Sequence, residues 1–188
     1  MILPGFCVAT KDLLGHKEAT NPTASRRYPI QNSNAMSAET RLIELKIELP
    51  PAPKPVGVYK PVVVTGNFAF ASGHGPLRSD GTLITGRVGA ELDLNGGKLA
   101  ARQVGLAMLA SLRAQLGSLD RIKRVIKVLG LVNCTNDFAE QPKVINGCSE
   151  LFADIWGADN GVGARSAIGT NSLPGNIAVE IEAIFELA

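Results

Sequence analysis

The chain contains 188 residues, of which 45% are hydrophobic, so it is long enough for one domain with a substantial core. Its net charge of +2 is spread along the chain without a cluster of Lys and Arg, and aromatic residues make up only 5%. Because nucleic-acid sites need basic patches and stacking side chains, a nucleic-acid partner is not expected. The sequence contains no run of about 18 apolar residues, which argues against a membrane-spanning helix and a membrane partner.

The N-terminal part of the chain differs in composition from the rest. It is rich in Ser, Thr, Asn and Pro and follows no hydrophobic period. We interpret residues 1–38 as a disordered extension, with Met36 as an alternative start, and residues 39–188 as the domain. Pro4 and Lys11 interrupt the first apolar stretch, so a secretory signal is not expected and we predict a cytoplasmic protein. An organellar transit peptide remains an alternative, although acidic residues dilute the basic ones.

The first three predicted elements are strands. Residues 41–49 alternate apolar and charged side chains, which predicts a strand with one buried face. After a proline-rich linker, residues 61–64 and 68–74 form two short apolar runs separated by a turn that contains Gly66. Because glycine and asparagine tolerate the positive φ of tight turns, these two runs are predicted to form a hairpin.

Two helices and two further strands complete the pattern. Apolar residues recur at helical spacing over residues 97–116, and Gly117 supplies a C-terminal stop. Residues 142–156 carry a second helical stripe. The nearly continuous apolar run 124–133 predicts a central strand covered on both faces, and residues 176–187 alternate as the last strand.

The order β-β-β-α-β-α-β predicts the fold class. It is typical of an α+β two-layer sandwich, in which two helices cover one face of a mixed β-sheet. No helix remains for the other sheet face, although that face carries Ile184 and apolar residues of the central strand. An uncovered apolar face of this kind indicates self-association.

Common catalytic and metal-binding signatures are absent from the sequence. It has no P-loop, GxSxG, HExxH or dinucleotide-binding motif, and its histidines and cysteines lack metal-ligand spacing, so we expect no metal. His74 is a candidate general base, but a single histidine in a glycine-rich turn is more often structural. We interpret Cys134 and Cys148 as buried core thiols.

The remaining candidates are polar residues at the ends of the predicted elements: Tyr59, Ser72, Asn146, Arg165 and Glu180. Arg165 is flanked by small residues, and the next acid, Glu180, lies fifteen positions later. Its guanidinium therefore needs a carboxylate or phosphate from elsewhere in the fold or from a ligand. Each residue also has an ordinary interpretation, such as a surface aromatic, a turn hydroxyl or an Arg165–Glu180 salt bridge.

The sequence resembles the Rid (YjgF-type) family of reactive intermediate deaminases over residues 50–187. The resemblance is carried by "PKPVGVYKPVVVTGNFAFASGHGPL", "NDFAEQPKVINGCSELF" and "ARSAIGTNSLPGNIAVEIEAI". Its most specific part is the Ala-Arg-Ser triplet followed by the first glutamate of VEIEAI. The resemblance implies a chorismate-mutase-like homotrimer with ligand clefts between subunits. It also implies cofactor-free hydrolysis of small 2-imino acids to 2-oxo acids and ammonia, as in 2-iminobutanoate/2-iminopropanoate deaminases.

The resemblance implies a role for each candidate residue. Arg165 matches the arginine that holds the substrate carboxylate, and a planar two-donor guanidinium suits a planar carboxylate. Glu180 matches the acid that holds the attacking water. The remaining matches line or shape the cleft: Tyr59, Ser72, Gly73 and Asn146.

Some features depart from the family pattern. Ala167 stands where many members have Cys or Val two residues after the arginine, and extra residues separate Phe138 from Asn146. The chain therefore resembles a divergent subgroup whose members are often named endoribonucleases. Two alternatives to imine hydrolysis stay open, namely an endoribonuclease acting on RNA and a non-catalytic trimer that binds a small carboxylate and regulates a partner.

Overall fold

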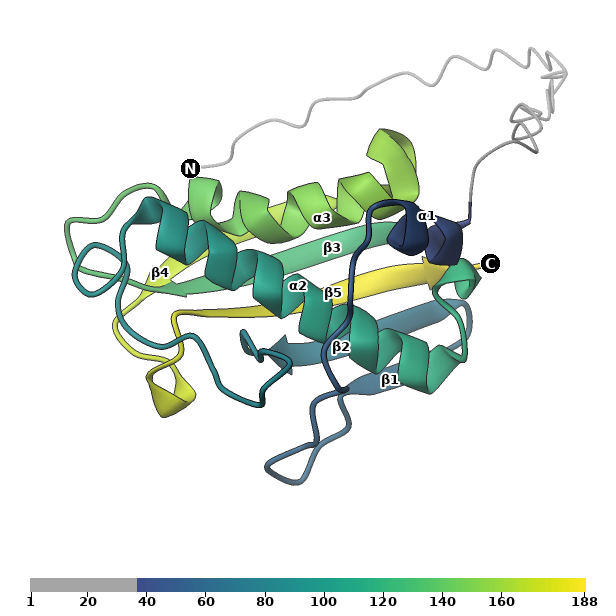
Figure 1. Ribbon diagram of the computed structural model, residues 1–188, viewed down its shortest axis with the longest axis horizontal. Coiled ribbons are helices and arrows are strands. Elements are labelled where there is room, and N and C mark those ends of the chain that lie inside the picture. Colours follow the sequence, from purple (N-terminus) through teal and green to yellow (C-terminus); the bar gives the residue numbers. More distant parts are fainter. Residues whose placement is uncertain (1–36) are drawn as a thin grey trace, which may run out of the picture. The chain divides into compact units, whose positions relative to one another are not determined.

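A mixed β-sheet forms the centre of residues 37–188, the part of the chain that this computed structural model describes (Figure 1). Its strands are β1 (Val62–Thr65), β2 (Phe68–His74), β3 (Ile122–Asn133), β4 (Ala164–Thr170) and β5 (Val179–Leu187). They form a five-stranded sheet in the order β1-β2-β5-β3-β4. The pairs β1–β2, β2–β5 and β5–β3 are antiparallel, whereas β4 is parallel to β3. Residues 1–36 of the predicted disordered extension lie outside the described residues, whereas Ser37 and Ala38 form the start of a helix.

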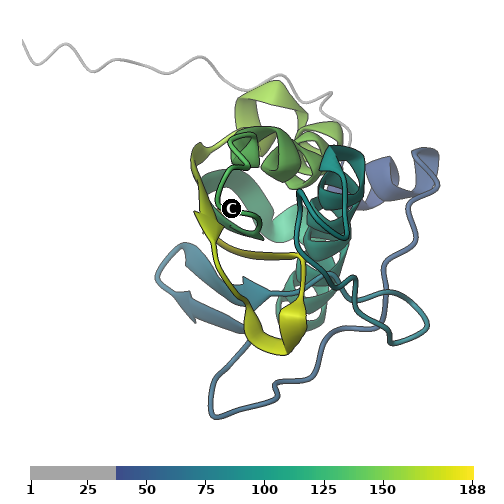
Figure 2. The same cartoon turned by 90° about the vertical axis from the view of Figure 1, so that its left-hand side faces the viewer.

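Two long helices, α2 (Leu94–Leu116) and α3 (Gln141–Gly161), cover one face of the sheet (Figures 1 and 2). α2 packs over β2 and β5, and α3 packs over β3 and β4. The Asp93 side chain caps the start of α2, and Gly117 ends this helix with a φ of 83°. The predicted α+β arrangement is therefore confirmed. Within residues 37–188, no helix is both long enough and apolar enough to cross a membrane.

The core lies between the sheet and these two helices. Alternate residues of β5, including Val179, Ile181 and Phe185, are buried beneath the helices, as the sequence predicts. Phe185 packs edge-on against Phe152 of α3, with their ring centroids 5.7 Å apart. The helices cover only one face of β3, so the predicted burial of that strand on both faces is not reached within the described chain.

Residues 41–49 do not form the predicted strand. The chain forms a helix there instead, α1 (Ala38–Glu44), with Ser37 as its N-cap. Leu42 is buried, whereas Ile43, which the strand would have buried, is 78% exposed. The alternation was misleading because a short helix buries its apolar residues at a different spacing from a strand. The Ser37 side chain also supplies an acceptor for an otherwise unpaired backbone amide at the start of this helix.

β4 has no counterpart among the predicted elements. Apart from Ile168, which is 51% exposed, its residues are small or polar, and none of them is fully buried. Its backbone pairs with the edge of β3 from Lys127 opposite Ala164 to Asn133 opposite Thr170. Hydrogen bonding to β3, rather than hydrophobic alternation, therefore defines this strand, which is why its sequence carries no strand signal.

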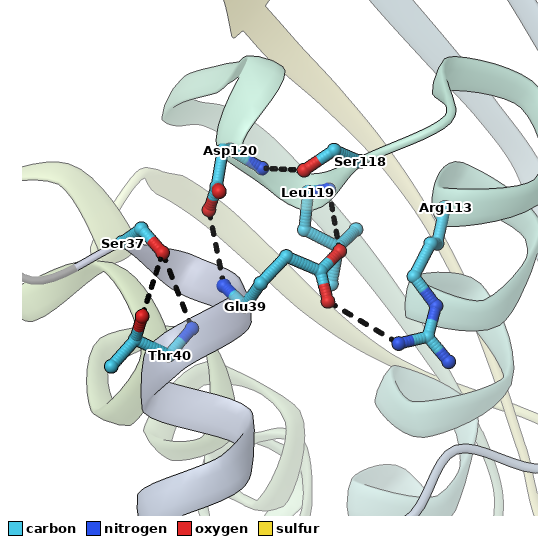
Figure 3. Close-up of polar contacts among 7 residues, drawn as sticks. All are labelled: Ser37, Glu39, Thr40, Arg113, Ser118, Leu119 and Asp120. Atoms are coloured by element: carbon cyan, nitrogen blue, oxygen red, sulfur yellow. Dashed lines mark hydrogen bonds and ion pairs between the residues drawn. The ribbon is translucent and has the colours of Figure 1, made fainter.

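Reciprocal capping ties α1 to the short 3-10 helix η1 (Leu119–Arg121), which follows α2 (Figure 3). The Glu39 carboxylate accepts a hydrogen bond from the Leu119 amide at 3.0 Å and lies 3.3 Å from the Arg113 guanidinium. In return, the Asp120 carboxylate accepts a hydrogen bond from the Glu39 amide at 3.0 Å. The start of each helix thus receives a carboxylate from the other, which stabilises both.

Replacing Glu39 with alanine removes the acceptor for the Leu119 amide and the partner of Arg113. We expect the free energy of unfolding to fall by about 1–2 kcal/mol, the cost of a lost cap and a partly exposed ion pair. Denaturant titration of the full chain measures this change. Glu44→Ala is the matched control, because Glu44 pairs only with Arg41 on the surface of the same helix. Equal losses in both variants would contradict the capping role.

Candidate functional site

A pocket of about 630 Å³ lies beside the C-terminal end of β2 and the N-terminal end of β5. Its other walls come from the proline-rich segment before β1, the loop after β2 and η2 (Pro174–Asn176). Part of the predicted site lines this cavity, which we call the Glu180 pocket: Tyr59, Ser72, Gly73 and Glu180. Two of the predicted site residues, Asn146 and Arg165, lie outside it.

Glu180 is the acidic group of the pocket. The pairing of β2 with β5 shifts between Ala71 and His74, and Gly73 lies in this irregular stretch against Glu180. A Cβ at position 73 would overlap the Glu180 carboxylate, whose Cδ is only 3.0 Å from that point. Any other residue at position 73 would force the Glu180 carboxylate to move from this place. Burial and, secondarily, the negative charge of Glu182 raise the pKa of the half-buried Glu180 carboxyl.

The polar groups next to Glu180 are already bonded to other parts of the fold. The Ser72 hydroxyl donates to the Lys60 carbonyl at 2.7 Å. His74 is buried, with Nδ1 2.6 Å from the Ser72 carbonyl and Nε2 2.9 Å from the Ser111 hydroxyl. A carbonyl only accepts, so Nδ1 carries the proton and Nε2 accepts from Ser111. Burial lowers the pKa of His74, which supports a structural role rather than a general base.

Arg165 projects from β4 towards α3. Its guanidinium donates to the Asn146 side-chain oxygen at 2.8 Å and to the Ser149 hydroxyl at 3.0 Å. Arg165 therefore has partners within the fold, but both of them are neutral. No carboxylate of residues 37–188 lies within ion-pair distance of it, so the Arg165–Glu180 salt bridge does not form. Cys148 lies nearby in the core as predicted, and burial raises its thiol pKa to about 12.

The two predicted catalytic residues occupy opposite faces of the sheet. Arg165 pairs with Val128, which is buried beneath the helices, and it hydrogen-bonds to α3 on that side. Glu180 lies between Val179 and Ile181, whose side chains face the helices, so its own side chain points to the other face. One chain thus holds two groups of site residues, the Glu180 pocket and an Arg165 cluster that consists of Arg165, Asn146 and Ser149.

Sequence reasoning missed several residues that build these two groups. Ser149 follows Asn146 by three positions, so both lie on one side of α3, a helical spacing that was available as a signal. The apolar walls of the Glu180 pocket come from loops: Leu77, Leu83 and Ile177. Loop residues follow no period, so nothing in the sequence marked them. Within residues 37–188, no group of His, Cys, Asp or Glu is arranged to hold a metal ion.

The raised pKa of Glu180 predicts a pH-dependent effect on stability. The unfolded carboxyl titrates at about 4.3. The folded one titrates higher, so ionising Glu180 destabilises the fold as the pH rises through this interval. We expect Glu180→Gln to melt at a higher temperature than the wild type at pH 7, and the gain to vanish near pH 4. Glu182→Gln, at an exposed site on the same face of β5, removes only the secondary cause of the raised pKa and should give a smaller gain. A gain that persists at low pH would show that it comes from packing instead.

Comparison with known proteins gives a consistent family assignment. Residues 39–185 match the family described as "YjgF/chorismate_mutase-like, putative endoribonuclease". Protein TCP17 of Trypanosoma cruzi is 40% identical over 146 residues, which cover 78% of this chain and 91% of that protein. The crystal structure of Atu1372 from Agrobacterium tumefaciens, described as having unknown function, is also 40% identical. That match covers 80% of this chain and 91% of the Agrobacterium chain, with a TM-score of 0.71.

A more distant structure contains a ligand. The crystal structure of E. coli TdcF with bound serine is 26% identical, covers 75% of this chain and 97% of the TdcF chain, and superposes with a TM-score of 0.52. The family match spans nearly all of the described residues and includes both the Glu180 pocket and the Arg165 cluster. The chain therefore belongs to the YjgF/chorismate mutase-like family.

Proposed function

We propose that this protein hydrolyses 2-imino acids to 2-oxo acids and ammonia without a cofactor. The observation that carries the proposal is the environment of Arg165. Its guanidinium is held by two neutral side chains, so its positive charge remains available for an anionic ligand. A 2-imino acid has a planar carboxylate that matches the two-donor edge of a guanidinium. The serine bound in the related TdcF also carries a carboxylate.

Glu180 supplies the second group that the reaction needs. A carboxylate with a raised pKa is a stronger base than an ordinary glutamate at neutral pH. As a water oxygen bonds to the carbon of the C=N group, Glu180 takes one water proton and returns it to the nitrogen. The hydroxyl proton of the resulting carbinolamine then moves to the nitrogen, the C–N bond breaks, and ammonia leaves with a 2-oxo acid. Atoms and charges balance without an oxidant, a reductant or a metal.

The site requires a second subunit, because Arg165 and Glu180 point to opposite faces of one chain. The sheet face that the helices leave uncovered carries apolar side chains with substantial exposure, including Val63, Phe70 and Ile168. An apolar face of this kind is stabilised when another copy covers it. We therefore propose a homotrimer in which Arg165 of one subunit and Glu180 of the next share a cleft. The buried, unpaired thiols Cys134 and Cys148 favour a reducing compartment, and we place the reaction in the cytoplasm.

The other two hypotheses agree less well with the pocket. An endoribonuclease must hold a phosphodiester, yet the charged groups that line the pocket are Glu180 and one exposed lysine, Lys54. Buried negative charge next to phosphate is unfavourable. A protein that only binds a carboxylate needs the cation, and a half-buried glutamate would weaken such binding. Both observations favour hydrolysis.

Imine hydrolysis is tested directly with 2-iminopropanoate generated in situ by an amino acid oxidase, which the purified full chain should remove faster than buffer does. We expect Arg165→Lys to lose about 2–3 kcal/mol in kcat/KM, because lysine keeps the charge but not the planar fork. Glu180→Gln should lower kcat by about 10²-fold. Glu182→Gln removes only the secondary contribution to the raised pKa of Glu180 and should lose much less activity than Glu180→Gln. If Arg165→Lys deaminates normally but melts at a much lower temperature, Arg165 is a structural residue. If the wild type cleaves RNA but does not remove the imine, the endoribonuclease hypothesis is favoured.

The shared cleft predicts complementation between two inactive variants. Light scattering should give about three times the 19.8 kDa chain mass for the wild type. Arg165→Ala and Glu180→Gln should each be nearly inactive alone. Mixed trimers made by co-expression contain one cleft with both native residues, so random assembly should restore about a quarter of the wild-type rate. No recovery in verified mixed trimers, or full activity of a monomer, would contradict a site shared between subunits.

A further inference from the structure

The Glu180 pocket extends beyond its carboxylate as an apolar cavity. We infer that it accepts a large hydrocarbon side chain, so that the preferred substrates are 2-imino acids with side chains of leucine size or larger. This inference rests on the proposed function and specifies its substrate class. The reacting C=N and carboxylate groups are common to all 2-imino acids, so the walls of the pocket must discriminate among them.

The far walls of the pocket are almost entirely apolar. Leu77, Leu83 and Ile177 line it together with the proline-rich segment that carries Tyr59. The polar groups at the near end offer little to a ligand, because the Ser72 hydroxyl and both His74 ring nitrogens are bonded within the protein. Apart from Glu180, the Tyr59 hydroxyl and the exposed Lys54, the wall thus presents hydrocarbon, and a polar side chain placed there would lose its hydrogen bonds to water.

Hydrogen bonds hold these walls in place. Leu77 and Leu83 face each other across an isolated antiparallel bridge, and Gln103 of α2 donates to the Leu77 carbonyl. On the other side, the buried Asn133 side chain donates to the Ile177 carbonyl at 3.2 Å. Two separate parts of the chain are therefore fixed to the core so that their apolar side chains line one cavity. A pre-formed wall of this kind discriminates between side chains without first having to become ordered.

The volume of the cavity favours an occupant larger than a methyl group. The space of about 630 Å³ is in the range of pockets that hold whole small ligands. The methyl group of 2-iminopropanoate would leave most of the wall in contact with water. Each additional methylene withdrawn from water improves binding by about fourfold. A leucine-type side chain should therefore gain at least about tenfold over methyl, even in a pocket that stays partly open.

Gly75 provides a way to narrow the pocket. A Cβ at this position would lie 3.1 Å from the Ile177 Cδ1 atom and 3.7 Å from the Leu83 Cδ2 atom, at the base of the apolar wall. The flexible end of Ile177 has room to adjust, so the fold should tolerate a larger residue. Gly75→Val therefore places hydrocarbon of the protein where the substrate side chain would lie.

The experiment compares imines generated in situ from alanine, leucine and phenylalanine, using the full chain and kcat/KM as the readout. We expect the leucine- and phenylalanine-derived imines to be hydrolysed at least about tenfold more efficiently than the alanine-derived imine. Gly75→Val and Leu83→Asn should both reduce this preference. Leu99→Asn, an equally polar change at an exposed position of α2, should leave it unchanged. A preference for the alanine-derived imine, or equal efficiencies for all three, would overturn the inference.

A binding measurement separates this inference from the proposed reaction. Calorimetry with two products, pyruvate and 4-methyl-2-oxopentanoate, reports the pocket without any turnover. We expect the branched 2-oxo acid to bind at least about tenfold more tightly to the wild type, and Gly75→Val to remove the difference. If this difference in affinity is found but no imine is hydrolysed, the deaminase proposal is refuted and the apolar subsite is retained. Equal affinities would refute the subsite, whatever the protein hydrolyses.

Discussion

The burial of one face of β5 beneath α2 and α3 is the constraint on which the rest of the structure depends. Val179, Ile181 and Phe185 must face the helices, because no other arrangement removes them from water. Since side chains of a strand alternate, Glu180 is forced onto the opposite face. A shift of one residue would exchange the two sets and bury a charge in the core, so the hydrophobic register also determines the position of the candidate catalytic acid.

The same constraint separates Glu180 from Arg165. β4 joins the sheet through its backbone, in a register that places Arg165 beside the buried Val128 and within reach of Asn146 on α3. The cation is therefore fixed on the helix side and the acid on the uncovered side. This separation prevents the two charges from neutralising each other within one chain. Both remain available to a ligand if a second copy brings them together, which is the basis of the proposed shared cleft.

Local sequence patterns predicted the elements whose own side chains determine their structure. They failed for the elements whose structure is determined by contacts with another part of the chain. The two long helices and β5 carry complete hydrophobic periods, so their positions followed from spacing alone. β4 has no such period, because its backbone pairing with β3, and not its own side chains, makes it a strand. The alternation over residues 41–49 pointed to a strand, but the Ser37 cap and the contacts of Glu39 with η1 and with Arg113 of α2 favour a helix. Those contacts join residues far apart in the chain, so the local alternation could not predict them.

By itself, the sequence determined which chemical groups are present, the periodic elements and the family resemblance, since these depend on residue type and spacing. It singled out Arg165 and Glu180 as unusual charges, but it could not tell whether they meet. Only the tertiary structure decided that they lie on opposite faces, that Asn146 and Ser149 hold the arginine, and that Gly73 makes room for the glutamate. Only the tertiary structure formed the pocket of Leu77, Leu83 and Ile177. These relations join residues far apart in the chain, and packing and strand register, which no local pattern encodes, bring them together.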